Sequence, residues 1–222
     1  MKEIILDTET TGISTKEGHR IVEIGCIELE NLIPTKNRFH CYLNPERKVS
    51  EKALEVHGYT DDFLSNKKKF SEIVDDFINF IEDKKLIIHN AEFDLSHLNN
   101  ELKILGKKPI LNEVTDTLIL ARNKFPGSPS SLDALCKRYR IDNSSRTLHT
   151  ALIDCELLTK VYINLIDQKE PSLNFLSNNE STDDLQIHKV KNYSKKVIKI
   201  NEEELKLHKA FLKNYLKKNY FN

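Results

Sequence analysis

Short apolar runs of strand-like composition alternate with amphipathic stretches over residues 1–167, and this alternation leaves few architectures open to the chain. Residues 4–7 begin with an apolar run that predicts a short buried strand. Residues 21–29 and 38–43 also have strand composition, and no helical pattern separates these three segments. We therefore expect the sheet to begin as a meander of three strands.

Side chains along a strand point alternately to its two faces. Within residues 21–29 this rule assigns two sets to opposite faces: Ile21, Glu23, Gly25, Ile27 and Leu29 on one, and Val22, Ile24 and Cys26 on the other.

Helical periodicity follows the meander. Residues 70–81 carry apolar side chains at three- and four-residue spacing, which is typical of a helix with one buried face. Later segments repeat the two patterns, with short strands at 86–88 and 114–116 and helices at 93–105, 130–139 and 151–165. Short strands that alternate with helices after a meander indicate an α/β fold in which helices flank a mixed sheet.

The pattern changes after Gln168. Residues 168–194 lack sustained periodicity and are rich in Asn, Ser, Asp and Lys, which predicts a flexible linker. Residues 195–222 form a third segment, with a new amphipathic pattern over 202–219 that predicts a short helix. We interpret this segment as a peptide that docks on a partner protein. A frayed terminal helix is the alternative.

The charge balance limits the kinds of partner. The 222 residues include 34 basic and 34 acidic side chains, so the formal net charge is zero. This argues against a protein that grips nucleic acid through a strong positive field. It leaves open a nucleic-acid enzyme whose metal ions supply local positive charge.

The sequence also bears on the compartment. No run approaches the roughly 18 apolar residues of a membrane span, and the first apolar run is too short for a signal peptide and ends in acids. The four cysteines, Cys26, Cys41, Cys136 and Cys155, form no C-x-x-C pair. We expect reduced core thiols in a cytosolic protein.

Two carboxylates lie at the end of the first expected strand. Asp7 and Glu9 are two residues apart, so both project to the same face of an extended strand. Paired carboxylates suit Mg²⁺ or Mn²⁺, which prefer oxygen ligands. An isolated pair of this kind is more often a solvated strand end.

A third carboxylate follows the strand expected at 86–88. Ligands in open α/β sheets gather at the carboxyl ends of the strands, so we expect Asp94 to face Asp7 and Glu9 from the first turn of a helix. The alternative is helix capping, with Asn90 as the N-cap and Glu92 and Asp94 near the positive end of the helix dipole.

His149 and Asp154 form the last pair. Five residues along a helix turn through about 500°, which leaves two helical side chains some 140° apart. We therefore place His149 in the loop that enters the helix and Asp154 in the early turns. From there His149, with an ordinary pKa near 6.5, lies over a bound water while Asp154 holds metal.

Together these residues resemble a known family. Four acids and one histidine occur in the stretches LDTETTG, HNAEFD and HTALID, in the order Asp-x-Glu, Asp, His-x4-Asp. This arrangement resembles the DEDD exonucleases, in the subgroup defined by the H-x4-D motif. Other stretches are similar to the proofreading epsilon subunits of bacterial DNA polymerase III: EGHRIVEIG, VHG, VTDTLILAR, FPG, SLDALCKRY and IDNSSRTLH.

The resemblance covers residues 1–167 and implies an RNase H-like exonuclease domain with a mixed five-stranded sheet. It implies hydrolysis of DNA from the 3′ end, with release of one nucleotide at a time and a bias toward mispaired ends. It makes His149 the general base and makes four carboxylates the ligands of two Mg²⁺ or Mn²⁺ ions: Asp7, Glu9, Asp94 and Asp154.

Substrate contacts are implied as well. The resemblance assigns Thr10 and His57 to the terminal nucleotide, together with the ligands Asp7, Glu9 and Asp154. One position departs from the family pattern. Lys52 stands five residues before His57 where the family has an acidic residue, with Glu51 adjacent, so the substrate contact at that position is in doubt.

The tail has implied partners. The terminal segment 195–222 would dock the polymerase alpha subunit in the bacterial cytoplasm, and a linker of about 30 residues has a root-mean-square span of roughly 30 Å. Within it, the stretch EPSLNF resembles a sliding-clamp-binding peptide, with Leu173 and Phe175 as its apolar contacts. A small theta-like subunit is a further possible partner.

Two other functions compete with this hypothesis. One is a DEDD exonuclease that trims RNA or single strands in general. The other is a catalytically silent scaffold that binds the polymerase, which the presence of all five chemical residues disfavours.

Overall fold

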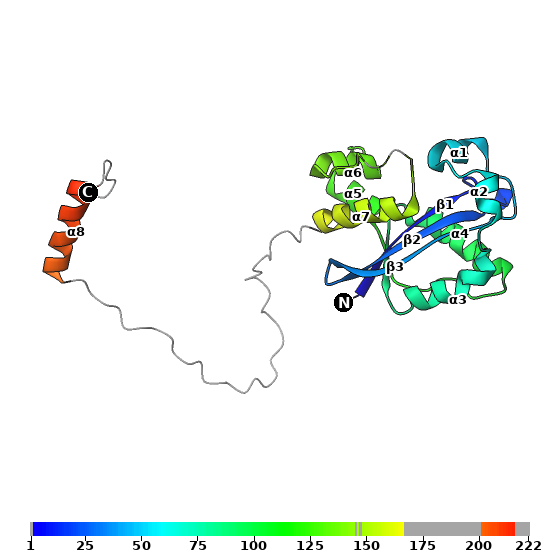
Figure 1. Cartoon of the computed structure of the whole chain (residues 1–222), viewed down its shortest axis with the longest axis horizontal. Helices are drawn as coiled ribbons and strands as arrows, with labels where there is room; N and C mark the ends of the chain where they lie inside the picture. The colour runs from blue at the N-terminus through cyan, green and yellow to red at the C-terminus, as the bar shows by residue number, and fades with distance from the viewer. Residues whose placement is uncertain (1, 145, 147, 167–200, 216–222) are drawn as a thin grey trace, which may run out of the picture. The chain divides into compact units, whose positions relative to one another are not determined.

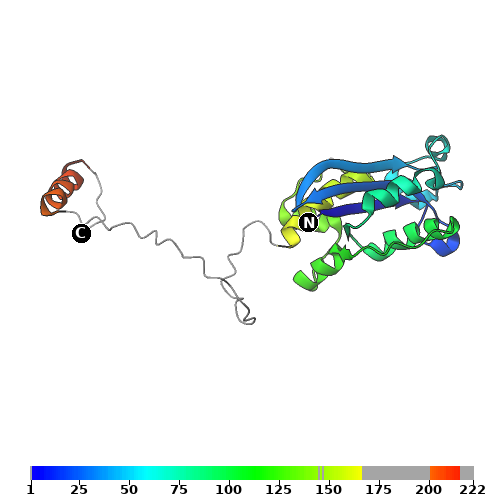
Figure 2. The same ribbon diagram turned by 90° about the horizontal axis from the view of Figure 1, so that it is seen from below.

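The computed structural model describes residues 2–144, 146, 148–166 and 201–215, and the chain divides into two units, Met1–Leu173 and Asn174–Asn222. In the first unit a single sheet is flanked by helices (Figures 1 and 2). Among the described residues, no helix is both long enough and apolar enough to cross a membrane.

Five strands form the sheet in the order β3-β2-β1-β4-β5. Their bounds are β1 Lys2–Thr10, β2 Ile21–Glu30, β3 Ile33–Tyr42, β4 Lys85–Ile88 and β5 Val114–Asp116. β2 is antiparallel to both β1 and β3, whereas β4 is parallel to β1 and β5 to β4. The expected meander and mixed sheet are confirmed, and β1 is the central strand.

Helices of the first unit cover both faces of the sheet. They are α1 Glu51–His57, α2 Asp61–Ser65, α3 Phe70–Ile81, α4 Ala91–Ile104, α5 Thr117–Lys124, α6 Leu132–Tyr139 and α7 Ala151–Leu165. The apolar sides of α3 and α4 pack on one face. Those of α5, α6 and α7 pack on the other.

Alternation along β1 decides where the acids point. Ile4 and Leu6 belong to the core beneath α3 and α4, whereas Ile5 belongs to the core beneath α7. Because side chains alternate, Asp7 and Glu9 continue the face of Ile5 and lie on the α7 side.

The alternation assigned to residues 21–29 is wrong at Ile21. Glu9 pairs with Glu23 and Thr10 pairs with Ile21, so the register between β1 and β2 shifts by one residue at this point. Such a bulge reverses the face of the residues beyond it. Ile21 therefore packs in the same core as Ile24.

Several element boundaries also differ from expectation. β3 begins at Ile33 rather than at residue 38, because its first half is an exposed edge that carries Pro34 and polar residues. α1, α2 and α5 were not expected, since these short helices bury only one or two residues each and therefore show no periodic apolar pattern. α4 begins two residues earlier than expected and α6 two residues later.

The four cysteines are free. Cys26, Cys136 and Cys155 are buried, as expected of core thiols, whereas Cys41 on β3 is only partly buried.

The second unit contains α8 (Glu202–Tyr215), which confirms a helix within the range expected at 202–219. Asn201 and Glu204 cap its start reciprocally, since each side chain accepts a hydrogen bond from the other's backbone N–H. Leu205 and Leu207 are exposed on it. The expected linker at 168–194 and the apolar residues Leu173 and Phe175 lie outside the described residues.

Candidate active site

The first two carboxylates lie near the carboxyl end of β1. Asp7 pairs with Gly25 of β2 and Glu9 pairs with Glu23. Burial raises the pKa of Asp7 well above its ordinary value, and the charges of Asp94 and Glu9 raise it further. Burial also raises the pKa of Glu9 to about 8, with Asp154 the next largest cause. Like charges this close are relieved either by a proton on one carboxyl group or by a bound cation.

Asp94 reaches the same place from the first turn of α4. Its side chain is buried, and one oxygen, Oδ1, accepts hydrogen bonds from the backbone N–H of Thr8 at 2.9 Å and from the Thr8 hydroxyl at 2.7 Å. Burial raises the pKa of Asp94 to about 7 although these hydrogen bonds lower it. The second oxygen, Oδ2, thus remains as a potential metal ligand.

The capping alternative for this segment is confirmed in part, since Asn90 takes the N-cap position and Glu92 and Asp94 lie in the first turn of α4. Asn90 occupies the N-cap position of α4 in a left-handed conformation (φ 69°), and its side chain makes no capping hydrogen bond. The carboxylate of Asp116 accepts from the backbone N–H groups of Asn90 and Ala91 instead. Asp94 bonds to β1, so its orientation is fixed by the sheet.

The start of α7 is pressed against β2 at Gly25. A Cβ atom on this glycine would lie 2.6 Å from the carbonyl carbon of Ala151, so no larger residue fits. The buried carboxylate of Glu23 accepts a hydrogen bond from the Ala151 N–H at 2.9 Å. These two contacts fix the first turn of α7, which carries Asp154, beside the end of β1.

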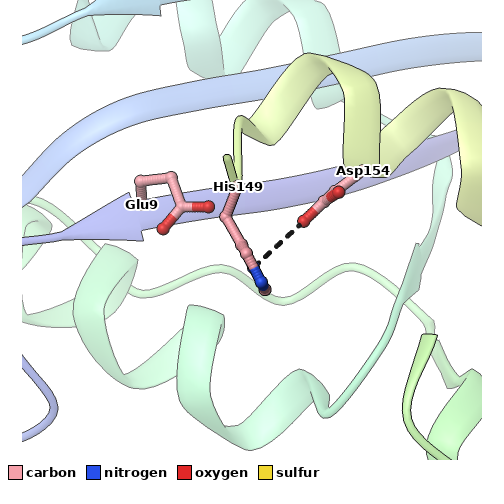
Figure 3. A group of neighbouring side chains, drawn as sticks. All are labelled: Glu9, His149 and Asp154. Atoms are coloured by element: carbon pink, nitrogen blue, oxygen red, sulfur yellow. Dashed lines mark ion pairs between the residues drawn. The ribbon is translucent and has the colours of Figure 1, made fainter. Parts of the chain in front are cut away.

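His149 lies in the loop before α7, and Asp154 lies in the first turn of that helix, as expected. The backbone N–H of His149 donates to the Val56 carbonyl of α1 at 3.0 Å. Glu9, His149 and Asp154 each offer one ligand atom, and these atoms all lie within 4.8 Å of one another. Figure 3 shows the three side chains converging from β1, the loop and α7.

Arg146 is a part of this site that the sequence analysis missed, although it lies in the quoted stretch IDNSSRTLH. Its guanidinium donates to both oxygens of Asp154, at 2.5 and 2.6 Å, and contacts Nδ1 of His149 at 2.8 Å. It also donates to Asp133 of α6 at 2.8 Å. The signal available in the sequence was a basic residue three positions before a proposed base.

A cavity of about 570 Å³ opens beside Glu9. Its lining includes Thr10, His57, Lys52 and Phe93. Both ring nitrogens of His57 are engaged by backbone, since Nε2 lies 3.2 Å from the Thr10 carbonyl and Nδ1 accepts from the Tyr59 N–H at 3.0 Å. Burial lowers the pKa of His57. This ring therefore offers a ligand its apolar edge and not a free nitrogen.

Comparison with known proteins agrees with this fold. A family model for exonucleases matches residues 4–162. The DNA polymerase III subunit epsilon of Rickettsia felis is 47% identical over 98% of this chain and 98% of its own length. That of Escherichia coli is 48% identical over 73% of this chain and 70% of its own length.

Two solved structures share the fold. Exonuclease X in complex with 5′ overhanging duplex DNA has a TM-score of 0.61 and 24% identity, and covers 75% of this chain and 92% of its own. The nuclease domain of 3′hExo, a DEDDh family member bound to rAMP, has a TM-score of 0.66 and 18% identity over 76% of this chain and 92% of its own.

The chain belongs to the exonuclease family and is a 3′–5′ exonuclease. Within that family its similarity is to the DNA polymerase III epsilon subunits, because the likeness to the Rickettsia felis protein extends over nearly the whole length of both chains.

Proposed function

We propose that this chain is the proofreading subunit of a bacterial replicative DNA polymerase and removes mispaired nucleotides one at a time from DNA 3′ ends. The observation that carries the proposal is the convergence of carboxylates from β1, α4 and α7 on one place, next to a histidine on a loop.

The donor set fits two Mg²⁺ or Mn²⁺ ions, since the four acids offer only oxygen ligands. The ligands are Asp7, Glu9, Asp94 and Asp154. The raised pKa values of Asp7, Glu9 and Asp94 also fit, because a divalent cation would relieve the repulsion among them. When bound, such ions acidify water and offset the charge that develops on the phosphate.

His149 is the proposed general base. Burial lowers its pKa, and the nearby charge of Arg146 lowers it further. The ring is therefore neutral at pH 7 and able to take a proton from the attacking water. Its position on a loop, anchored by the backbone contact to Val56, allows the ring to approach a substrate phosphate.

The cavity beside Glu9 is the proposed subsite for the terminal nucleotide. Its volume of about 570 Å³ lies within the usual range of roughly 300–1,000 Å³ for small-molecule sites. Thr10, His57 and Lys52 form part of its wall. A mispaired end frays at lower cost than a paired one, which favours removal of errors.

A digestion assay tests this proposal. Wild type with Mg²⁺ should release deoxynucleoside monophosphates faster from a mismatched primer than from a matched one. Asp7→Asn should abolish release, and His149→Ala should reduce the rate roughly 10²–10⁴-fold. Full activity of His149→Ala would contradict the role of His149 as the general base.

The same assay separates the competing functions. A preference for short RNA over the mismatched primer would instead favour an RNA-trimming exonuclease. No metal-dependent release of nucleotides would favour a scaffold.

The tail is proposed to hold the enzyme on the replication machinery in the bacterial cytoplasm. The exposed leucines Leu205 and Leu207 of α8 suit docking on the polymerase alpha subunit. Leu173 and Phe175 are proposed to bind the sliding clamp, and a theta-like subunit is a further candidate partner. Pull-down of the clamp that is unchanged by Leu173→Ala and Phe175→Ala would contradict the clamp contact.

A further inference from the structure

Arg146 contacts both Asp154 and His149 at the centre of the site. Its Nε and Nη2 donate to Oδ1 and Oδ2 of Asp154 in a two-pronged pair, and its Nη2 lies 2.8 Å from Nδ1 of His149. Both side chains of this ion pair are buried, with exposed fractions of 7% for Arg146 and 6% for Asp154. A charge-assisted pair of this geometry is strong and specific.

These contacts use the atoms that the proposed reaction also needs. A carboxylate has about four acceptor positions, and the two that face Arg146 are taken. A divalent cation on Asp154 would also meet the positive charge of Arg146 at close range. We propose that Arg146 is a positioning residue that competes with the divalent cation for Asp154, an inference that rests on the proposed function.

The same guanidinium controls the proton on His149. Arginine has donors and no acceptor, so Nδ1 of His149 must accept in this contact. A neutral imidazole that accepts at Nδ1 carries its proton on Nε2. In that arrangement neither ring nitrogen has a lone pair free for the attacking water. Release of Arg146 therefore frees a metal ligand and the general base in one step.

Asp133 is a second carboxylate partner that can hold the guanidinium of Arg146 after it leaves Asp154. It accepts from Nη1 of Arg146 at 2.8 Å and from Asn143 at 2.9 Å, and it lies on α6 rather than on the metal-binding elements. Arg146 can thus leave Asp154 without losing every partner. The ligand and base would become available together when the cation binds, which couples base activation to metal loading.

Calorimetric titration of the full chain with Mn²⁺ tests the competition. Arg146→Gln should bind Mn²⁺ at least about tenfold more tightly, because a charge-assisted pair no longer has to be broken first. Arg146→Lys, which replaces the two-pronged contact by a single point charge, should fall between. Lys137→Gln removes a charge from an exposed position of α6 and should match wild type.

Thermal unfolding gives a second readout. Arg146→Gln should melt below wild type in EDTA, since Asp154 loses its counter-charge, and should recover most of that difference in Mn²⁺. An equal loss of melting temperature with and without Mn²⁺, at unchanged affinity, would make Arg146 a structural brace. Unchanged affinity with a lower kcat/KM would make it a substrate contact. Both results overturn the inference.

Two further measurements keep the test decisive. The ¹⁵N chemical shifts of His149 in wild type with EDTA should report a proton on Nε2, and a proton on Nδ1 would overturn the inference without any variant. Asp154→Asn should weaken Mn²⁺ binding. If it does not, the proposed metal site itself fails, which is a different result from an unchanged Arg146→Gln.

Discussion

The absence of a side chain at Gly25 allows α7 to touch the sheet beside the acids. The carbonyl carbon of Ala151 lies only 2.6 Å from where a Cβ would be, and Gly25 pairs with Asp7 across the strands. One glycine thereby limits the distance between the proposed metal ligands Asp7 on β1 and Asp154 on α7. Metal sites tolerate little error in such distances, since catalytic geometry fails with displacements of about 1 Å.

Gly25→Ala should therefore impair catalysis as well as stability. Overpacking of this kind costs about 1–3 kcal/mol, and outward movement of α7 carries Asp154 away from Asp7. We expect kcat/KM on a mismatched primer to fall by about 10²-fold or more. Gly106→Ala is the matched control, since Gly106 has φ 67° with no atom within 4 Å of an added Cβ. It should lose stability and keep its kcat, and an equal loss of kcat would contradict the argument.

His97 contributes a pH dependence to folding. Its side chain is 1% exposed, Nε2 donates to the Ile13 carbonyl at 3.1 Å, and Nδ1 has no partner among the described residues. Burial lowers its pKa in the folded protein. The unfolded chain binds a proton near pH 6.5, whereas the folded protein resists it. This histidine's contribution is therefore present above pH 6.5 and is lost as the pH falls toward the depressed folded pKa.

His97→Gln should reduce that acid sensitivity. Glutamine retains an N–H donor for the Ile13 carbonyl but does not titrate. Urea unfolding at pH 7.5 and 5.0 should show a smaller loss of unfolding free energy in the variant than in wild type. An identical pH dependence would mean that His97 is not the group that titrates.

At the scale of elements, long periodic segments were predicted well. The expected bounds of α3 and α7 agree with the structure residue for residue. Both helices bury many apolar side chains, and the regular spacing of these residues in the sequence predicts a helix. Periodicity did not predict α1, which forms part of the cavity wall, because this helix has seven residues and only one of them is buried.

The site was predictable to the extent that its residues lie at strand ends and helix starts. Asp7, Glu9 and Asp94 follow directly from that rule. Arg146 did not, since its role depends on a side chain that reaches Asp154 and His149 across a loop of irregular backbone. Periodicity carries no information about such loops, and charge alone does not distinguish Arg146 from the other basic residues.

The N-cap of α1 offers a prediction at this scale. The Ser50 side chain accepts from the Ala53 N–H, and the helix that follows carries Lys52, His57 and the Val56 carbonyl that holds His149. Ser50→Ala should cost about 1 kcal/mol of unfolding free energy and raise KM several-fold through a loosened cavity wall.

Thr60→Ala is the matched control for Ser50→Ala. It removes the equivalent cap of α2, where Thr60 accepts from the Phe63 N–H, and neither residue lines the cavity. It should lose similar stability with KM unchanged. If Ser50→Ala and Thr60→Ala had the same KM, α1 would have no specific role in substrate binding.

For the whole molecule, the zero net charge conceals an imbalance between the two units. Residues 174–222 contain ten lysines against six acids, which leaves 24 basic and 28 acidic side chains in residues 1–173. The nuclease unit is thus slightly acidic, and its own field does not attract DNA. In the proposed function, a tethered partner would deliver the 3′ end and offset this weak attraction, because tethering replaces affinity by effective concentration.

Deletion of residues 174–222 tests this division of labour. Both hydrophobic cores consist of residues before 167, so the truncated chain should keep its melting temperature and its kcat at saturating single-stranded DNA within about twofold.

α8 has 14 residues. Isolated helices shorter than about 12–15 residues are marginal in water, so we expect α8 to gain stability by docking. Co-purification with the polymerase alpha subunit should therefore be lost on deletion, and Leu207→Glu in the full chain, which changes a side chain 72% exposed on α8, should weaken it. Retained co-purification of the truncated chain would place the docking surface on the nuclease unit instead.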